Sequence, residues 1–363
     1  MSRIIIEILA FEQGKSFGYQ EYVLNLLDYY YVYHNNLKFV NITVVCCKGQ
    51  EKYLKKYADR MNIYTCTCGS VLIRLLKQTW LPFTLKVQKE DVILFTANYS
   101  SLLKRCKYVL VIHDLLFKHK SWLPNRFMRW QREFYLPISI KNADKVICIS
   151  KFTEKEVLYH YPKAKGKTKV IYNYFNFQKY FVFSNVKKEN IFISVCSSAY
   201  HKNTITVLKA FCEYYQRGGI FNLIFVGNLA KNSEAGRFYG DLDIGIKNRI
   251  QFFYKIDNAT LGMLYRRSKA YISASLFEGL GMPIVEAMYF DLPVVLSDDE
   301  VFHEVSMDKG IYFNPLDYNE LVDIFFNIEH DIYRSENFSE LIKRHYSEEN
   351  TSALYVKLLN SLV

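Results

Sequence analysis

Short apolar runs alternate with longer segments of helical spacing throughout the chain. In the first half, runs rich in Val and Ile predict strands at 3–9, 41–47, 91–97, 108–114, 144–150 and 169–173. Between them, segments such as 19–34 and 125–141 have the length and spacing of helices. Nearly continuous apolarity is typical of strands that are buried on both faces, so this alternation predicts a parallel sheet covered by helices.

The same alternation begins again in the second half. The expected strands there are 190–197, 222–227, 249–255, 270–275, 293–298 and 310–314. The polar, aromatic stretch 173–190 has no clear periodicity and marks the expected boundary, and 363 residues suit two domains. The predicted fold class is therefore α/β, with two Rossmann-like doubly wound domains that bind ligands at the carboxyl ends of their strands.

Charge is distributed unevenly between the halves. Residues 1–180 carry 29 Lys and Arg against 13 Asp and Glu, whereas residues 181–363 carry 18 against 23. The first half is thus expected to face something anionic, and charge alone allows nucleic acid or a membrane surface. No nucleic-acid recognition motif is present, while cations and aromatics interleave at 77–86 and 118–132. We expect an anionic membrane surface as a partner and no nucleic acid.

The eight cysteines indicate neither a disulfide framework nor a metal centre. None lies in a CxxC pair or beside histidines at zinc spacing, and several sit inside apolar runs, as in VVCC and KVICIS. The first apolar run is short for a signal peptide, and no apolar stretch reaches the ~18–20 residues of a membrane span. The expected location is cytoplasmic, with peripheral attachment at the inner face of the membrane as the alternative.

The segment from Ser275 to Met288, SLFEGLGMPIVEAM, carries the strongest chemical signal. A strand ends at Ser275, a loop with Gly279 and Gly281 follows, and Pro283 suits the first turn of a helix. Glycines and a helix N-terminus together favour phosphate binding. Phosphate would repel a neighbouring carboxylate, so Glu278 in the loop and Glu286 in the helix are expected to bind sugar hydroxyls. The alternative is a glycine turn followed by a helix with a surface glutamate.

This segment resembles the EGxGxPxxE signature of the retaining GT-B glycosyltransferases of family 4, also described as glycosyl transferases group 1. The resemblance implies that Glu278 contacts the transferred sugar and Glu286 the nucleotide ribose. It also implies an acceptor-binding domain at 1–180 and a nucleotide-sugar-binding domain at 181–345. The helix at 346–363 would cross back to the first domain.

Further motifs extend the resemblance along the chain. His113-Asp114 matches the family's HD pair, whose histidine lies beside the reacting sugar, although a strand-end histidine can also be structural. His201-Lys202-Asn203 resembles the family's KN element, whose lysine neutralises the donor diphosphate, although a solvated lysine at a helix start is the alternative. The implied catalytic residues are His113, Glu278 and Lys202. The implied donor-binding residues are Glu286, Gly279, Leu280, Gly281, Lys202, His201 and Gly227. The acceptor-side loop is expected at Gly14, Gly18 and Tyr19, where the family's paired glycines are absent.

The expected function is a retaining, metal-independent glycosyltransferase of surface polysaccharide synthesis, of the O-antigen, lipopolysaccharide or capsule kind. The donor is a UDP- or GDP-type nucleotide sugar, with GDP-mannose favoured, and the acceptor is a glycan or a lipid-linked glycan. No cofactor and no metal are expected, because no DxD lies near a predicted strand end. The alternatives are another GT-B enzyme, such as a nucleotide-sugar epimerase, and a non-catalytic GT-B binding module.

Overall fold

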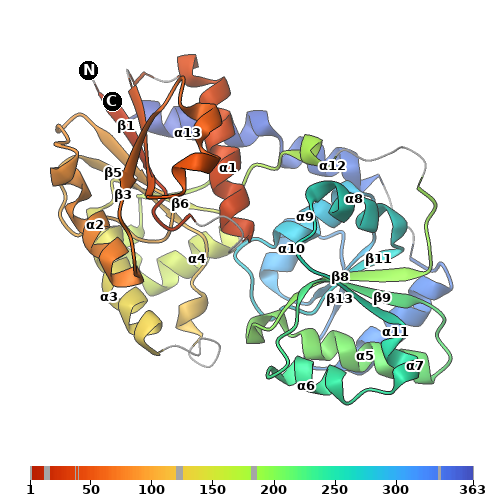
Figure 1. Cartoon of the computed structure of the whole chain (residues 1–363). Helices are drawn as coiled ribbons and strands as arrows, with labels where there is room; N and C mark the ends of the chain where they lie inside the picture. Colours follow the sequence, from red (N-terminus) through yellow and green to blue (C-terminus); the bar gives the residue numbers. More distant parts are fainter. Residues whose placement is uncertain are drawn as a thin grey trace. The chain divides into compact units, whose positions relative to one another are not determined.

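The chain forms two compact units, Met1–Phe175 with Tyr346–Val363, and Asn176–His345. The computed structural model describes residues 2–11, 17–36, 38–39, 41–119, 126–180, 186–333 and 337–362 (Figure 1). The boundary between the units falls inside the stretch that lacks periodicity in the sequence. Each unit is built around one parallel sheet, which confirms the predicted fold class.

The sheet of the first unit has the order β3-β2-β1-β4-β5-β6-β7, with every described pair parallel. Its strands are β1 (Arg3–Glu7), β2 (Asn41–Cys47), β3 (Asn62–Cys66), β4 (Val92–Phe95), β5 (Lys107–Ile112), β6 (Lys145–Cys148) and β7 (Thr168–Val170). Its α-helices are α1 (Phe17–Val32), α2 (Val71–Thr84), α3 (Arg126–Asn142), α4 (Lys151–His160) and α13 (Glu348–Asn360). The central strand β4 is buried at every position, as its unbroken apolar run predicts.

The strand β3 is the one described strand of this sheet that the apolar pattern does not predict. It lies at the sheet edge beside β2, and of its residues only Cys66 is buried. An edge strand is half solvated and needs no continuous apolar run, so its sequence NIYTC gives a weak signal.

The second unit repeats the architecture with the strand order β10-β9-β8-β11-β12-β13. Its strands are β8 (Ile191–Ser197), β9 (Asn222–Asn228), β10 (Ile250–Phe253), β11 (Ala270–Ser273), β12 (Val294–Ser297) and β13 (Ile311–Phe313). Its α-helices are α5 (Thr204–Gln216), α6 (Glu234–Gly240), α7 (Ile244–Lys247), α8 (Asn258–Arg267), α9 (Met282–Tyr289), α10 (Glu300–Ser306), α11 (Tyr318–Glu329) and α12 (Phe338–His345). Figure 1 shows α5, α6, α7 and α11 on one face of this sheet and α8, α9, α10 and α12 on the other.

The C-terminal helix α13 belongs to the first unit although it follows the second in sequence. The hydroxyl groups of Tyr355 and Tyr22 lie 2.7 Å apart, and Asn360 Nδ2 donates to the backbone oxygen of Asn36 at 3.0 Å. These contacts fix α13 beside α1 (Figure 1). Within the described residues, no helix combines the length and apolarity that a membrane crossing requires.

Both sheets reverse their winding direction at one point. In the first sheet the reversal lies between β1 and β4, and in the second between β8 and β11. Loops leave such a point in opposite directions and open a crevice at the carboxyl ends of the strands, where ligands of doubly wound folds bind. The candidate site residues follow these strands.

Candidate functional site

In the second unit, the loops after β8 and β11 are joined at the switch point of the sheet. The backbone N–H of Leu276 donates to the backbone oxygen of His201 at 2.7 Å. Asn203 adopts a left-handed conformation with φ of 48° and donates from Nδ2 to the Pro315 oxygen at 2.9 Å. The turn that carries Lys202 is therefore held on two sides before α5 begins.

Lys202 and Glu278 form an ion pair between these two loops. Lys202 Nζ donates to Glu278 Oε1, and the two side chains are 24% and 16% exposed. The lysine is thus partnered by a carboxylate and is not simply solvated at a helix start. A cation at this position can interact with any anion that enters the switch point, in competition with Glu278.

The helix α9 starts directly beside this pair. Gly281 precedes it with φ of +85°, a conformation that glycine adopts without strain, and Pro283 lies in the first turn as predicted. A Cβ at Gly281 would lie 2.9 Å from Ile284 Cδ1, the end of a side chain that can shift, so the positive φ is what favours glycine in this turn. Leu280 is buried and anchors the loop, whereas Gly279 is half-buried. The loop therefore places the α9 N-terminus next to the loop carboxylate Glu278.

Glu286 lies inside the unit and not on its surface. It is 8% exposed and accepts a hydrogen bond from the Tyr265 hydroxyl at 3.1 Å. Burial, followed by the charge of Glu286, raises the pKa of Tyr265 well above its usual value, so this hydroxyl remains a donor. The interpretation of Glu286 as an ordinary surface residue is wrong, because a carboxylate with so little exposure needs polar partners.

Gly227 is required by strand packing. It has φ of +139° at the end of β9, and a Cβ there would lie 2.1 Å from the backbone oxygen of Cys196 on β8. This close approach of two strands accounts for the glycine without a ligand. Its place among the donor-binding residues rests on the family resemblance alone.

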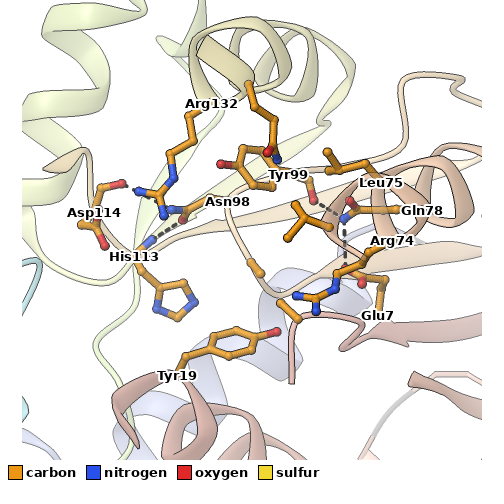
Figure 2. Close-up of a pocket in the computed structure, with 14 residues that line it drawn as sticks. Glu7, Tyr19, Arg74, Leu75, Gln78, Asn98, Tyr99, His113, Asp114 and Arg132 are labelled. Carbon is orange, nitrogen blue, oxygen red and sulfur yellow. Dashed lines mark hydrogen bonds between the residues drawn. The ribbon is translucent and has the colours of Figure 1, made fainter. Parts of the chain in front are cut away.

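The first unit contains a cavity of about 280 Å³ at its own switch point (Figure 2). The ends of β1, β4 and β5 form its floor, and α1, α2 and α3 contribute side chains. The lining residues are Glu7, Ala10, Tyr19, Val71, Arg74, Leu75, Gln78, Ala97, Asn98, Tyr99, His113, Asp114, Gln131 and Arg132. The cavity therefore brings the predicted residues His113 and Tyr19 together with several charged residues that the sequence motifs did not indicate.

His113 is fixed by hydrogen bonds and by two aromatic rings. Its backbone N–H donates to Asn98 Oδ1 at 2.8 Å, and its Nε2 lies 2.8 Å from the Thr96 backbone oxygen. The rings of Tyr19 and Tyr22 meet the imidazole edge-on at 5.5 and 4.7 Å. Burial lowers the pKa of His113, which keeps the ring neutral at pH 7. Since a carbonyl oxygen only accepts, Nε2 carries the proton and Nδ1 is an acceptor.

Asp114 supports the loop beside His113. Its Oδ1 accepts a hydrogen bond from the backbone N–H of Leu116 at 3.0 Å. The Asn98 side chain also reaches this loop, with Nδ2 3.5 Å from the Asp114 backbone oxygen (Figure 2). Asp114 therefore has a positioning contact, while it also lines the cavity.

Glu7 is a functional candidate that motif reasoning missed. It is 1% exposed, with Oε1 accepting from the Leu9 N–H at 2.7 Å and Oε2 accepting from Gln78 Nε2 at 3.1 Å. Desolvation raises the pKa of Glu7 to about 7, because the hydrogen bonds and the charge of Arg74 offset burial only in part. The available signal was a single charged residue inside an apolar run, which occurs in RIIIEILA for Glu7 and in VLIRLL for Arg74.

The expected acceptor-side loop is described only in part. Gly14 lies outside the described residues. Gly18 lies in the first turn of α1, where it is exposed and a Cβ would meet no atom within 4 Å, so the described backbone does not require a glycine. Tyr19 follows in the same helix and lines the cavity. Its hydroxyl lies 2.6 Å from Thr96 Oγ1, and it is the donor because the Thr96 hydroxyl already donates to the backbone oxygen of Glu7.

Among the residues that the structure describes, no three or more His, Cys, Asp or Glu side chains cluster in a way that could hold a metal ion. The described cysteines are free thiols, and all except Cys68 are buried. Burial raises the pKa values of the buried cysteines, for example to about 12 for Cys46, as expected of small apolar core residues.

Both units of the chain match sequence families of known proteins. Residues 176–345 match the sequence family Glycosyl transferases group 1, and residues 39–179 match Glycosyltransferase Family 4. The O-antigen chain mannosyltransferase RfbU of Salmonella typhimurium is 26% identical over 297 residues, covering 79% of this chain and 81% of that protein. The serotype-specific mannosyltransferase WbdA of Escherichia coli is 33% identical over 127 residues, which cover 34% of this chain and 15% of that longer protein.

Solved structures share the fold over nearly the whole chain. HepE of Anabaena, solved in complex with UDP, has a TM-score of 0.73 at 16% identity and covers 99% of this chain and 100% of that chain. TarM has a TM-score of 0.74 at 12% identity and covers 100% of this chain and 98% of that chain. Together, the two family matches span residues 39–345 and the fold agrees over both units. The chain belongs to the family 4 glycosyltransferases with the GT-B fold.

Proposed function

We propose that this glycosyltransferase moves a sugar from a nucleotide-diphosphate sugar to a glycan or lipid-linked glycan, with retention of the anomeric configuration, in surface polysaccharide synthesis. The observation that carries the proposal is the Lys202–Glu278 pair beside the N-terminus of α9, at the switch point of the second sheet. The mannosyltransferases among its relatives favour a GDP-mannose-like donor. HepE, which shares the fold, was solved with UDP, which fits a nucleotide diphosphate as leaving group.

In the proposed donor complex, each group of the second unit has one task. Lys202 and the backbone amides of Gly279 and Gly281 bind the diphosphate, and Glu278 then turns from the lysine to the hydroxyls of the transferred sugar. Glu286 binds the ribose, with Tyr265 holding its carboxylate in place. The charge of Lys202 matters most as the bond breaks, because negative charge grows on the leaving phosphate.

The proposed chemistry is transfer on the front face of the sugar. The bond from the anomeric carbon to the diphosphate oxygen breaks, the acceptor oxygen bonds to the same face, and its proton passes to the departing phosphate. A neutral His113 contributes through its ring or backbone to steadying the positive charge at the anomeric centre. The alternative is double displacement, which requires a carboxylate nucleophile such as Asp114 or Glu278 on the opposite face.

The experiment that tests the function has two stages. A panel of UDP- and GDP-sugars is first scored by the rise in melting temperature, and the best donor is then incubated with membrane-extracted acceptors. We expect a GDP- or UDP-sugar to stabilise the protein and to be consumed, with product linkages read by NMR. An inverted product would contradict the retaining assignment, and trapping of a glycosyl-enzyme would contradict front-face transfer. Epimerised free donor would favour the epimerase alternative, and a bound donor that is never turned over would favour the binding module.

Metal independence is part of the proposal. Lys202 and the α9 N-terminus supply positive charge where the leaving group forms, which is the task that a divalent cation performs in other transferases. We therefore propose full activity in the presence of EDTA. Loss of activity with EDTA that manganese restores would contradict it.

We also propose that an anionic membrane surface is a partner, supported by an apolar surface on α2 and α3. On α2, Leu72, Leu76 and Trp80 are 56%, 49% and 54% exposed, and on α3 Trp130 is 60% exposed. Lys77 lies on α2 among these side chains, and Arg126 and Arg129 lie on α3. Residues 120–125 of the basic segment expected from the sequence lie outside the described residues. Arg132, which the basic segment also included, lines the cavity instead.

Vesicle binding tests this surface. Wild-type protein is expected to sediment with vesicles that contain phosphatidylglycerol, less so as salt rises. The double substitution Leu76→Ser and Trp80→Ser should reduce binding, whereas the control Ile220→Ser and Ile244→Ser removes exposed apolar side chains from the second unit and should not. Equal binding by both double variants would contradict the assignment.

A further inference from the structure

The turn that carries His113 is held by the segment of chain that leaves the neighbouring strand. The strands β4 and β5 pair in parallel, and beyond β4 the backbone N–H of Asn98 donates to the backbone oxygen of Val111 at 2.9 Å. The Asn98 side chain then accepts from the His113 N–H (Figure 2), and the imidazole meets the Thr96 backbone oxygen. Both the backbone and the ring of His113 are therefore placed by residues 96–98.

Asn98 has a backbone conformation and a side chain that together suit this turn. Its φ is 52°, a left-handed conformation that asparagine and aspartate adopt more readily than other residues with a side chain. Its Oδ1 accepts from the His113 N–H at 2.8 Å, and its Nδ2 faces the Asp114 backbone oxygen at 3.5 Å. Asparagine thus combines this conformation with one acceptor and one donor, whereas aspartate would offer only acceptors and glycine no side chain.

The imidazole of His113 has little freedom once the turn is fixed. The rings of Tyr19 and Tyr22 meet it edge-on, and its Nε2 lies 2.8 Å from the Thr96 backbone oxygen. Thr96 is fully buried, and its hydroxyl donates to a backbone oxygen of β1 at 2.7 Å. A shift of the turn by about 1 Å away from Thr96 would lengthen the Nε2 contact beyond hydrogen-bonding range. The place of the ring therefore depends on the contact that Asn98 makes with the backbone.

We propose that Asn98 is a positioning residue of sugar transfer, which acts through His113 by fixing the turn in which the histidine lies. The step from position to rate rests on the proposed function, in which His113 steadies charge at the anomeric centre, whereas the placement of the imidazole does not. A misplacement of about 1 Å at a reacting centre can lower a rate about 100-fold. The loss of one of several contacts that hold such a group is therefore expected to lower it about 10-fold.

Direct contact with the acceptor is the competing role, because Asn98 also lines the cavity of the first unit. The two roles differ in the reactions that they affect. A residue that positions His113 acts on the breaking of the donor bond, so it affects transfer of the sugar to water as well as to a glycan. A residue that only binds the acceptor affects transfer to the glycan and leaves donor hydrolysis unchanged.

Three variants separate the side chain of Asn98 from its backbone. Asn98→Gly removes both side-chain contacts and leaves the left-handed backbone unstrained, so the first unit should still fold. Asn98→Asp keeps an acceptor for the His113 N–H and should show an intermediate rate. Asn142→Ala is the matched control, since Asn142 Nδ2 donates to the backbone oxygens of Ser101 and Leu102 at 3.2 and 3.0 Å and so holds the later part of the same segment.

The kinetic test uses GDP-mannose, or the donor that the nucleotide-sugar panel selects. Hydrolysis of the donor and transfer to the membrane-extracted acceptors are measured for each variant, and calorimetry gives the donor Kd. We expect Asn98→Gly to lower both rates about 10-fold and to leave the donor Kd within about twofold of the wild type. Asn142→Ala should lower the melting temperature at most and change neither rate.

Nitrogen NMR of isotope-labelled histidine side chains tests the placement of the ring without any substrate. The variant His113→Gln identifies the signal of His113. In the wild type we expect a neutral ring with the proton on Nε2 and a pKa below its usual value, because the ring is buried and Nε2 faces the Thr96 oxygen. In Asn98→Gly the proton should be shared between the two nitrogens and the pKa should move toward its usual value, whereas Asn142→Ala should give the wild-type signal.

Each result supports or overturns the proposal. Loss of both rates together with an altered His113 signal in Asn98→Gly supports it, as does partial recovery in Asn98→Asp. Wild-type rates in Asn98→Gly, an unchanged His113 signal, or a loss of glycan transfer with normal hydrolysis would each overturn it, and the last would assign Asn98 to acceptor binding. If no nucleotide sugar is turned over by any protein while Asn98→Gly still alters the His113 signal, the proposed function fails and the positioning of His113 stands.

Discussion

Replacement of Glu7 by Gln tests the electrostatics of the cavity through the pH dependence of stability. Glu7 is 1% exposed, and desolvation raises its pKa from 4.5 to about 7. Between these pH values the folded protein binds more protons at Glu7 than the unfolded chain does. Stability therefore falls as pH rises through this window, since folding must then either keep a buried charge or take up a proton.

The magnitude follows from the shift. A full shift of this size corresponds to about 3 kcal/mol, and most of it, about 2 to 3 kcal/mol, develops between pH 5 and pH 8. In Glu7→Gln the amide oxygen can still accept from the Leu9 N–H, and the charge is gone. Any constant cost of repacking against Gln78 cancels when the two pH values are compared. The variant should therefore gain about 2 to 3 kcal/mol over the wild type on going from pH 5 to pH 8.

The assay must report the first unit alone, because a chain of two units need not unfold in one step. Urea unfolding followed by hydrogen exchange on peptides that cover β1 and β4 gives the free energy of that unit at each pH. Glu90→Gln is the matched control, since Glu90 is an exposed carboxylate of the same unit. A variant-minus-wild-type difference that stays constant from pH 5 to pH 8 would refute the reasoning, because the raised pKa would then be absent.

Three further outcomes are expected in the second unit. Lys202→Ala should lower the kcat of transfer by a larger factor than it raises the donor Kd, because the lysine charge acts mainly on the leaving phosphate. Initial rates and calorimetry measure the two quantities. Equal effects on both would assign Lys202 to donor binding alone. Glu286→Gln should raise the nucleotide-sugar Kd about 10-fold, with Tyr265→Phe giving a smaller rise, and an unchanged Kd would count against the ribose contact. Gly227→Ala should destabilise the unit by more than about 2 kcal/mol in urea unfolding, because its Cβ would lie 2.1 Å from a backbone oxygen of the next strand, whereas Gly240→Ala, with open space around it, should not.

Much of the fold could be predicted from the sequence because buried parallel strands have continuous apolar runs. Every predicted run became a strand, within a few residues at each end, and the missed β3 is the half-exposed edge of its sheet. The turn that follows α9 is another instructive case. Asp291 stands there with φ of 55°, a left-handed conformation that aspartate tolerates better than most residues, and its Oδ1 accepts from the Ser339 N–H at 2.8 Å.

The two candidate sites differed in how far the sequence revealed them. The residues proposed to bind the donor lie in two short segments, the turn before α5 and the loop with the first turns of α9, so Lys202 and the segment 278–286 could be found as local motifs. The cavity of the first unit takes Glu7, Arg74 and Arg132 from three separate elements, β1, α2 and α3. These residues are far apart in the sequence and form no local motif, so only the fold of the sheet and its helices shows that they line one cavity.

This difference has a physical reason that bears on specificity. A nucleotide diphosphate presents the same phosphates and ribose whichever sugar it carries, so a fixed loop and helix start can bind it. In the proposed function, the acceptor is recognised by side chains that project from helices around the cavity of the first unit, and each can change without disturbing the sheet below. In this chain those helices, α2 and α3, carry both the arginines of the cavity and the exposed apolar residues. Under the proposed function, the lining of this cavity and contact with a lipid surface would therefore depend on the same two helices, so that a change in one helix can alter both properties at once.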